Sequence, residues 1–467
     1  MLQITIVVLY VIVTILVGVW SRKKAKTSKT FDGVGLGFGL CVVASAGEWM
    51  GGTSTTGVSE YGYVYGISGA WYTIANGLGI CFLALFFAKL FRSLKTPTVS
   101  GIIGKYIGKK ARIVSGALLL LVMATVGVSQ MIALGSLGEA LFGLKAAPAI
   151  LILGYGVLIY TVCGGMPAVG YTNILHMVVM YGGSLLALFL CLKDVGGWTT
   201  LTDTLPKSYF SGFTIGFPKV SSWIIASVLG ACTAQAGLQP ILGAKDEKTA
   251  VKSSYAIAVL VAPFGIITAI LGMIAKVKFP FLENPKLALS ELLMTLPPMA
   301  GGVVMASIFA AILSTAAPIF LACGTIFSRD IFCELKFLNK NNADDKAILK
   351  VSRTATFVAG TVCILMSVLL NGSSTILDLV YFAYSIRGSL FIILLLGIYW
   401  KKISQSGAIV GMILTSLLGL FWIIYENIFG TYPISPYLTE TYISVIAATV
   451  FTVVGSLLQK KNKQDTK

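Results

Sequence analysis

The sequence predicts an all-α integral membrane protein, and three observations support that prediction. Hydrophobic residues make up 56% of the 467 residues, and charged residues only 11%. The mean hydropathy is +0.88, a value that no soluble core of this length requires. Apolar runs long enough to cross about 30 Å of hydrocarbon recur along the chain, and short loops rich in lysine and arginine separate them.

Thirteen such runs are present in the sequence. We place them at about residues 2–20, 33–60, 69–91, 112–142, 147–165, 168–192, 219–241, 252–276, 298–328, 350–371, 375–399, 404–427 and 438–458. The predicted fold is therefore a bundle of thirteen transmembrane helices, in which one extra helix precedes a ten-helix core and two helices follow it.

We expect one transmembrane domain over residues 1–467, because no linker or low-complexity block divides the chain. A five-helix unit with an odd number of crossings makes the next unit enter from the opposite side, so the core is predicted to be a 5+5 inverted repeat. The expected parts are a leading helix with an inner loop (1–32), a first repeat (33–193), an outer loop (194–218), a second repeat (219–401), and two trailing helices with a basic tail (402–467).

The basic residues indicate how the chain is oriented. A formal net charge of +17 also suggests a nucleic-acid partner, so the positions of the charges must decide. Most of the 35 lysines and arginines fall in alternate loops and in the tail. Under the positive-inside rule this asymmetry predicts a multi-pass cell-membrane protein with its N-terminus outside and its C-terminus cytoplasmic. It also excludes a nucleic-acid partner, because basic loops on one side are explained by insertion in a lipid bilayer.

Two of the apolar runs are interrupted by polar and glycine residues. Gly47 to Ser54 interrupts the first core helix and contains the carboxylate of Glu48, and Gly230 to Pro240 interrupts the sixth. Backbone groups at that depth must find partners, so such breaks persist where they line an enclosed cavity. Matched breaks in two halves predict a transport site at the membrane midplane. Small residues also serve close helix packing, which is the alternative interpretation of either break alone.

A hydroxyl pair in the eighth core helix suggests a cation site. Ser314 and Thr315 follow the carbonyl of Ala311 by one helical turn, and together they offer hard, uncharged oxygen ligands of the kind sodium favours. Carbonyls freed by the first break, those of Cys41 and Ala44, are the expected remaining ligands. The alternative is that both hydroxyls only bond back to the preceding turn.

The sequence resembles the sodium:solute symporter family of sugar, proline, sialic acid, pantothenate and monocarboxylate carriers. The resemblance covers the whole chain and depends on Ala311-x-x-Ser314-Thr315, on Phe327-Ser328-Arg329-Asp330-Ile331, on Tyr160-Thr161-x-x-Gly164-Gly165-Met166-x-Ala168-Val169 and on the first break. It implies a leucine-transporter-like core. It also implies that Cys41, Ala44, Ala311, Ser314 and Thr315 match the widely shared sodium site.

The chain departs from the family pattern where relatives commonly carry Trp-Thr-Asp. Here the sequence reads Tyr171-Thr172-Asn173, and His176 follows where a glutamine is usual. The family's aspartate is associated with a second sodium ion or with coupling, so neutral Asn173 favours one sodium ion per cycle. His176, the single histidine, titrates near neutral pH when unperturbed and suggests proton coupling. Helix packing near the inner interface is the alternative role, which we favour.

Two opposite charges in the membrane mark the expected solute region. Glu48 matches a sugar-binding glutamine of the sugar-carrying relatives, and Arg387 lies in the tenth core helix; intramembrane charges are functional by default. Either the two form a structural ion pair, or Arg387 binds a substrate carboxylate while Glu48 meets an ammonium or hydroxyl group. Further candidates for contact with the solute are the neighbouring side chains Trp49, Gln130, Gln235 and Gln239.

The predicted function is sodium-coupled import of a small polar organic solute, carboxylate-bearing or amino-acid-like, by alternating access. A proton-coupled or sugar and polyol symporter of the same fold is the alternative within the class, and a membrane-embedded channel or sensor is the alternative outside it. An enzyme is not expected, because no clustered nucleophile or metal constellation is present. We expect sodium as the co-transported ion, no other metal ion, no cofactor, and a functional monomer.

Overall fold

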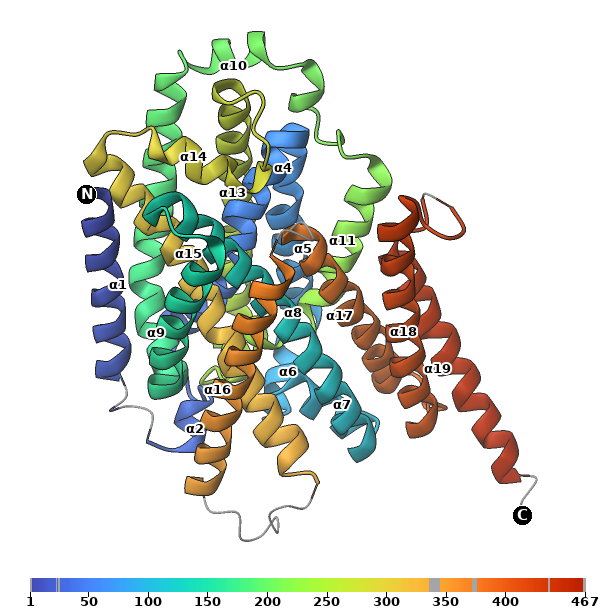
Figure 1. Ribbon diagram of the computed structural model, residues 1–467. Helices are drawn as coiled ribbons and strands as arrows, with labels where there is room; N and C mark the ends of the chain where they lie inside the picture. Colours follow the sequence, from blue (N-terminus) through green and yellow to red (C-terminus); the bar gives the residue numbers. More distant parts are fainter. Residues whose placement is uncertain are drawn as a thin grey trace.

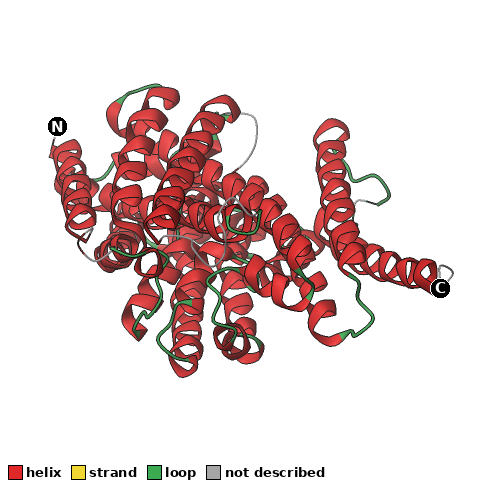
Figure 2. Cartoon of the chain, turned by 90° about the horizontal axis from the view of Figure 1, so that it is seen from below, coloured by secondary structure: helices red, strands yellow, loops and turns green. Residues whose placement is uncertain are grey.

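The computed structural model describes residues 2–21, 23, 26–335, 345–371, 376–435 and 437–464 (Figure 1). This part of the chain is helical and contains no β-strand, as Figure 2 shows. A single isolated β-bridge joins Leu36 to Ala244. As drawn in Figure 1, the upper end of the bundle holds α10 and α14, and the lower end holds α2, α6 and α7.

The first half of the chain forms the leading helix and the elements of the predicted first repeat. Their bounds are α1 (Leu2–Ser21), α2 (Ser28–Phe31), α3 (Phe38–Trp49), η2 (Thr53–Gly57), α4 (Val58–Tyr65), η3 (Gly66–Ala70), α5 (Trp71–Phe86), α6 (Ala88–Ser93), α7 (Val99–Tyr106), α8 (Lys109–Phe142), α9 (Ala146–Asp194), α10 (Trp198–Thr204) and η4 (Lys207–Phe210).

The second half forms the predicted second repeat and the trailing helices. Its elements are α11 (Phe217–Ala231), α12 (Gln235–Leu242), α13 (Glu247–Lys278), η5 (Pro285–Leu287), α14 (Ala288–Met294), α15 (Pro298–Ile326), η6 (Phe327–Phe332), α16 (Asp345–Leu370), α17 (Ile376–Tyr399), α18 (Gln405–Phe429) and α19 (Glu440–Gln464). The trailing helices α18 and α19 pack on each other and on α17, at the right-hand side of Figure 1.

By length and composition, fewer helices in the described part of the chain qualify as membrane spans than the thirteen that the sequence predicts. Among the described residues, ten helices are long and apolar enough to cross a membrane, and Phe38–Trp49 and Ala383–Tyr399 are shorter apolar helices. The predicted count of thirteen is therefore not confirmed. One difference is that α9 covers two predicted runs, 147–165 and 168–192, in one helical element.

Gly165 breaks α9 between those two runs. Its φ of 57° and ψ of −152° are not helical, and φ in this range strains residues with a side chain. A Cβ there would also lie 2.4 Å from the Phe31 ring. Pro167 follows in the first turn of the second segment, where its missing N–H costs no hydrogen bond.

The first core helix is interrupted within the stretch that the sequence predicts. Helix α3 ends at Trp49, and Met50 leaves the helical region with φ −112° and ψ 46°. The chain resumes as the π-helical turn η2 and continues as α4. Glycine is required at the break, because a Cβ at Gly51 would lie 2.1 Å from the Thr315 hydroxyl oxygen. Close approach to α15 thus positions the interruption.

The second interruption lies beside the first. Helix α11 ends at Ala231 and α12 begins at Gln235. The start of α3 is tied to the end of α12 by the bridge from Leu36 to Ala244. Nearer the break, the Ser45 hydroxyl donates to the Gly237 carbonyl at 2.7 Å. The two half-helices α3 and α12 therefore run antiparallel, which is the arrangement that an inverted repeat requires.

Helix α15 forms the centre of the core. It packs against α1, α3, α8, α9 and α16, and its residues from Val304 to Ile326 are all buried. A helix that is apolar all round belongs inside a bundle. Polar side chains on such a helix must find partners within the protein, and this requirement leads to the hydroxyl pair of the candidate site.

Candidate functional site

The two hydroxyls of α15 point at the carbonyls of the first break. The Ser314 hydroxyl donates to the carbonyl oxygens of Ala311, at 2.8 Å, and Gly47, at 3.0 Å. The Thr315 hydroxyl donates to Gly47 at 2.7 Å and to Glu48 at 3.1 Å. Five neutral oxygens from two helices thus converge in a buried cluster, which is the chemistry that a sodium ion requires.

The predicted carbonyls of the first break lie at different places. Asn173 Nδ2 donates to the Val43 carbonyl at 3.2 Å and to the Ala44 carbonyl at 3.5 Å, and a Cβ on Gly47 would lie 2.3 Å from the same nitrogen. Ala44 is therefore at the edge of the oxygen cluster. The Cys41 thiol donates to the carbonyls of Leu36 and Pro240, nearer the lower end. The structure adds Gly47 and Glu48, one turn further along α3, to the oxygens that sequence reasoning selected.

Asn173 and His176 occupy separate environments although they lie one turn apart on α9. Asn173 contacts α3 beside the oxygen cluster. His176 is fully buried, and its Nδ1 is hydrogen-bonded to the hydroxyl of Tyr10 on α1. Asn173 is thus adjacent to the candidate cation site, whereas His176 packs against the leading helix.

Glu48 and Arg387 face each other on the other side of the break. Arg387 Nη2 lies 3.9 Å from Glu48 Oε1, with side-chain exposures of 0% and 2%. The guanidinium carbon of Arg387 lies 4.7 Å from the centroid of the Tyr384 ring, one turn earlier on α17. Gly237 at the second break leaves room for the carboxylate, because a Cβ there would lie 2.8 Å from Glu48 Oε2 and 2.6 Å from Trp49 Nε1.

The pair leaves several hydrogen-bonding groups unused. Glu48 Oε2 and all three guanidinium nitrogens of Arg387 are buried, and they have no hydrogen-bond partner among the residues that the structure describes. Removing two charges from water costs several kcal/mol per ion, and their attraction repays this only with good geometry and additional hydrogen bonds. At 3.9 Å the pair lacks both. The geometry leaves donors and an acceptor facing one another for a polar ligand.

Four polar residues near this pair are not among the residues predicted from the sequence. The Thr233 hydroxyl, from the second break, donates to the Arg387 carbonyl at 2.7 Å. The hydroxyls of Tyr72 and Tyr384 lie 3.3 Å apart. Tyr72 and the buried Asn76 are one turn apart on α5, and this i, i+4 polar pair on an apolar helix was the available signal.

The three predicted glutamines bond to backbone and side chains of the protein. Gln130 Oε1 accepts from the Gly52 N–H at 2.7 Å, and its Nε2 donates to the Thr53 hydroxyl at 2.8 Å. Gln130 therefore caps the restart of the first broken helix. Gln235 and Gln239 lie toward the lower end, where Gln235 Oε1 accepts from Val99 N–H at 2.8 Å. None of these contacts joins a glutamine to Glu48 or Arg387.

A buried ionic network fixes the lower end. Asp330 accepts from the hydroxyls of Thr98, at 2.9 Å, and Ser100, at 2.6 Å, and from Arg112 Nε at 2.7 Å. Arg112 Nη1 also donates to Glu334 at 2.7 Å. These contacts join α7 and α8 to η6. Because η6 continues from α15, they connect the start of α8 to the helix that carries the hydroxyl pair.

A second set of contacts lies in the loop between α2 and α3. Arg329 Nη2 lies 2.7 Å from Asp32 Oδ2, and Gln239 Nε2 donates to the Asp32 carbonyl at 3.0 Å. Burial raises the pKa of the Asp32 carboxyl, and the Arg329 guanidinium partly offsets that rise. The loop before the first broken helix is thus bound both to η6 and to the second broken helix.

The upper end is closed by tyrosine contacts. The Tyr63 hydroxyl donates to the Phe279 carbonyl at 2.6 Å and accepts from the Leu282 N–H at 3.0 Å. The Tyr209 hydroxyl donates to the Tyr63 carbonyl at 3.1 Å. With Glu48 and Arg387 almost without exposure, the central site is closed from both ends in this conformation.

An all-helical bundle in which two broken helices meet beside a buried hydroxyl pair and charge pair defines a secondary transporter. The model of the sodium:solute symporter family matches residues 33–415. The chain therefore belongs to the sodium:solute symporter family, whose members are transporters and not enzymes.

Solved structures of transporters share the fold. A Na⁺-coupled sialic acid symporter, in a substrate-bound outward-open state, is similar with a TM-score of 0.77 and 18% identity over 98% of each chain. A nucleobase-cation-symport-1 family transporter, closed with bromovinylhydantoin bound, has a TM-score of 0.62 and 15% identity over 94% of each chain. MhsT in complex with L-phenylalanine has a TM-score of 0.59 and 15% identity, over 89% of this chain and 98% of that one.

Proposed function

We propose that the protein is a sodium-coupled symporter that imports a small solute carrying both a carboxylate and an ammonium group, as amino acids do. The observation that carries the solute class is the buried pair of Glu48 and Arg387, which face each other with unused hydrogen-bonding groups. A guanidinium binds a carboxylate through two parallel hydrogen bonds. A carboxylate in turn accepts from an ammonium group, so a zwitterion satisfies both residues at once.

The coupling ion is assigned to the oxygen cluster between α3 and α15. Membership of the sodium:solute symporter family supports sodium as that ion. The hydroxyls of Ser314 and Thr315 and the carbonyls of Ala311 and Gly47 are the proposed ligands, with the carbonyls of Ala44 and Cys41 as the ligands that the family resemblance adds. Asn173 lies beside this cluster without a charge, which favours one sodium ion per cycle.

The position of this cluster next to the break links sodium binding to solute binding. Glu48 contributes its carbonyl to the Thr315 contact and its side chain to the charge pair. Sodium at the cluster therefore fixes the backbone that carries the solute-binding carboxylate. An ion drives the cycle only through different affinities for two conformations, and inward release requires the contacts of Asp330 with α7 and α8 to separate.

The proposed orientation places the lower end in the cytoplasm. Basic residues concentrate in the loops of that end, which follows the positive-inside rule. The N-terminus is then outside, the C-terminus cytoplasmic, and the protein works in the cell membrane as a monomer.

Thermal stability of the purified protein tests the proposal. The panel holds zwitterionic amino acids, carboxylates without an amine, amines without a carboxylate, and sugars, each in sodium and in potassium. A ligand that binds the folded state raises the melting temperature. We expect one or more amino acids to raise it in sodium alone. Stabilisation by a sugar would show that the solute is a sugar and not an amino acid. Stabilisation that depends on pH and not on sodium would establish proton coupling instead.

A solute that passes this test is then examined in proteoliposomes. Uptake of the solute against its own concentration gradient, driven by an inward sodium gradient and absent with an equal inward potassium gradient, is expected of a symporter. Solute flux that stays downhill under every ion gradient would favour a channel, which is the alternative outside the transporter class.

A further inference from the structure

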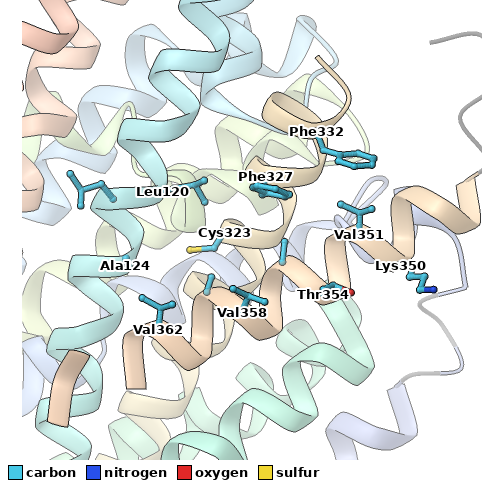
Figure 3. Close-up of a pocket in the computed structure, with 13 residues that line it drawn as sticks. Leu120, Ala124, Cys323, Phe327, Phe332, Lys350, Val351, Thr354, Val358 and Val362 are labelled. Carbon is cyan, nitrogen blue, oxygen red and sulfur yellow. The ribbon is translucent and has the colours of Figure 1, made fainter. Parts of the chain in front are cut away.

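A cavity separate from the central site lies between α8, α15, η6 and α16. Its volume is about 810 Å³. Figure 3 shows Leu120 and Ala124 on one side, Cys323 and Phe327 behind, and the side chains of α16 along its length. Its lining is almost wholly apolar. It shares no residue with the sodium or solute assignments.

The position of the cavity indicates what fills it. Leu121, Val358 and Val362 are 51%, 54% and 48% exposed, although each lies in a helix apolar enough to cross a membrane. The cavity therefore opens toward hydrocarbon. Along α16 it extends from Lys350 to Val362, which at 1.5 Å per residue is roughly 18 Å. One leaflet contributes about half of a 30 Å hydrocarbon core, so the length suits one acyl chain.

A single charge marks one end of the cavity. Lys350 and Thr354 are its polar lining residues, and Figure 3 shows both at the same end. Lys350 belongs to the second turn of α16, at the lower end of the bundle. A lysine near the end of a span places its ammonium group at the level of the lipid headgroups. Anionic headgroups attract such a cation.

We propose that this cavity is a phospholipid site, in which one acyl chain lies along α16 between Lys350 and Val362 and an anionic headgroup phosphate contacts Lys350. The proposal is independent of the transported solute.

The site reaches the lower network through η6. Phe327 and Phe332 line the cavity, whereas Asp330, between them in the sequence, accepts from Thr98 and Ser100. A bound acyl chain therefore packs against the segment whose carboxylate joins α7 to η6. Occupancy of the cavity is expected to stabilise the closed lower end.

The test uses the full-length protein, freed of lipid in detergent and titrated with phosphatidylglycerol or phosphatidylcholine. Val358→Trp fills the cavity, and Lys350→Gln removes the charge. Val259→Trp, at a residue 74% exposed on α13, and Lys248→Gln serve as matched controls. Phosphatidylglycerol is expected to raise the melting temperature of the unaltered protein more than phosphatidylcholine does. Val358→Trp should halve that rise or more, and Lys350→Gln should remove the difference between the two lipids.

Several results would overturn the proposal. Equal stabilisation by the two lipids in the unaltered protein, or an unchanged lipid response in Val358→Trp, would do so. Loss of a dimer in Val358→Trp would show that a second copy covers the cavity. If Val358→Trp fails to fold, native mass spectrometry of Lys350→Gln decides the matter. Phosphatidylglycerol should remain bound to the unaltered protein and to Lys248→Gln, and retention by Lys350→Gln at the same level would count against the site.

Discussion

Arg387 Nη2 lies 3.9 Å from Glu48 Oε1 in the interior of the protein, too far for a hydrogen bond between the two charges. The guanidinium instead lies over the Tyr384 ring, and within the described part of the chain its nitrogens have no hydrogen-bond partner. The attraction between the charges remains, while the hydrogen bonds that normally accompany such a pair are left for another molecule.

Removing one member of this pair is expected to destabilise the protein more than removing both. A single substitution leaves an uncompensated buried charge, which costs about 3–5 kcal/mol. Glu48→Gln and Arg387→Gln should each lower the melting temperature, and the double variant should recover part of the loss. Melting curves of the four proteins form the double-mutant cycle. Additive losses in the double variant would show that the two charges do not interact.

The sodium assignment predicts a selective effect of the hydroxyl pair. Replacing Ser314 and Thr315 together by alanine removes two of the five oxygens of the cluster. The melting temperature should then no longer rise with sodium. Ser307→Ala is the matched control, because Ser307 is buried on the same helix but bonds only to the Val304 carbonyl one turn before it. Sodium stabilisation that persists in the double alanine variant would refute the assignment.

The glycine at the first break offers a test of close packing. A Cβ at Gly51 would lie 2.5 Å from Thr315 Cβ, so Gly51→Ala must push α15 away from the break. We expect a lower melting temperature and weaker stabilisation by sodium. Gly39→Ala on α3 is the control, since a Cβ there meets nothing within 4 Å; it should keep or raise stability, because alanine favours helix by about 1 kcal/mol over glycine.

The sequence predicted those features that one segment determines. A cluster of glycine and polar residues inside an apolar run weakens a membrane helix locally, and both breaks fall within the expected stretches. The hydroxyl pair was equally predictable from the sequence, because Ala311, Ser314 and Thr315 lie within one helical turn and meet in the structure.

Other features depend on which helix lies opposite, and the sequence could not supply them. The sequence predicts Gln235 as a solute ligand because it follows a break, yet its amide bonds to the backbone of the α6–α7 connection. The choice among carbonyls of α3 depends on the rotation of that helix toward α15, which placed Gly47 at the hydroxyls and Ala44 beside Asn173. The helical period determines which residues share a face, but not which helix that face contacts.

The lower network predicts a variant that opens inward more readily. Asp330→Asn removes the charge of the carboxylate that accepts hydrogen bonds from Arg112, Thr98 and Ser100. Arg112 keeps its contact with Glu334. Backbone amides of α7 should then exchange with deuterium faster than in the unaltered protein. Asp203→Asn, in the exposed helix α10, should leave that exchange unchanged. Equal protection of α7 in both variants would mean that Asp330 does not hold the lower end closed.

Gln130 distinguishes a structural amide from a solute ligand. Its oxygen accepts from the Gly52 N–H and its nitrogen donates to the Thr53 hydroxyl, so Gln130→Leu leaves a buried backbone donor without a partner. Such a loss costs about 1–3 kcal/mol and should lower the melting temperature even without solute. Gln130→Glu keeps an acceptor for Gly52, but it buries a carboxylate and loses the donor to Thr53, so it should lower the melting temperature as well. If Gln130→Leu instead melts like the unaltered protein and only fails to respond to the solute, the amide contacts the solute directly, and the capping role inferred from its contacts is wrong.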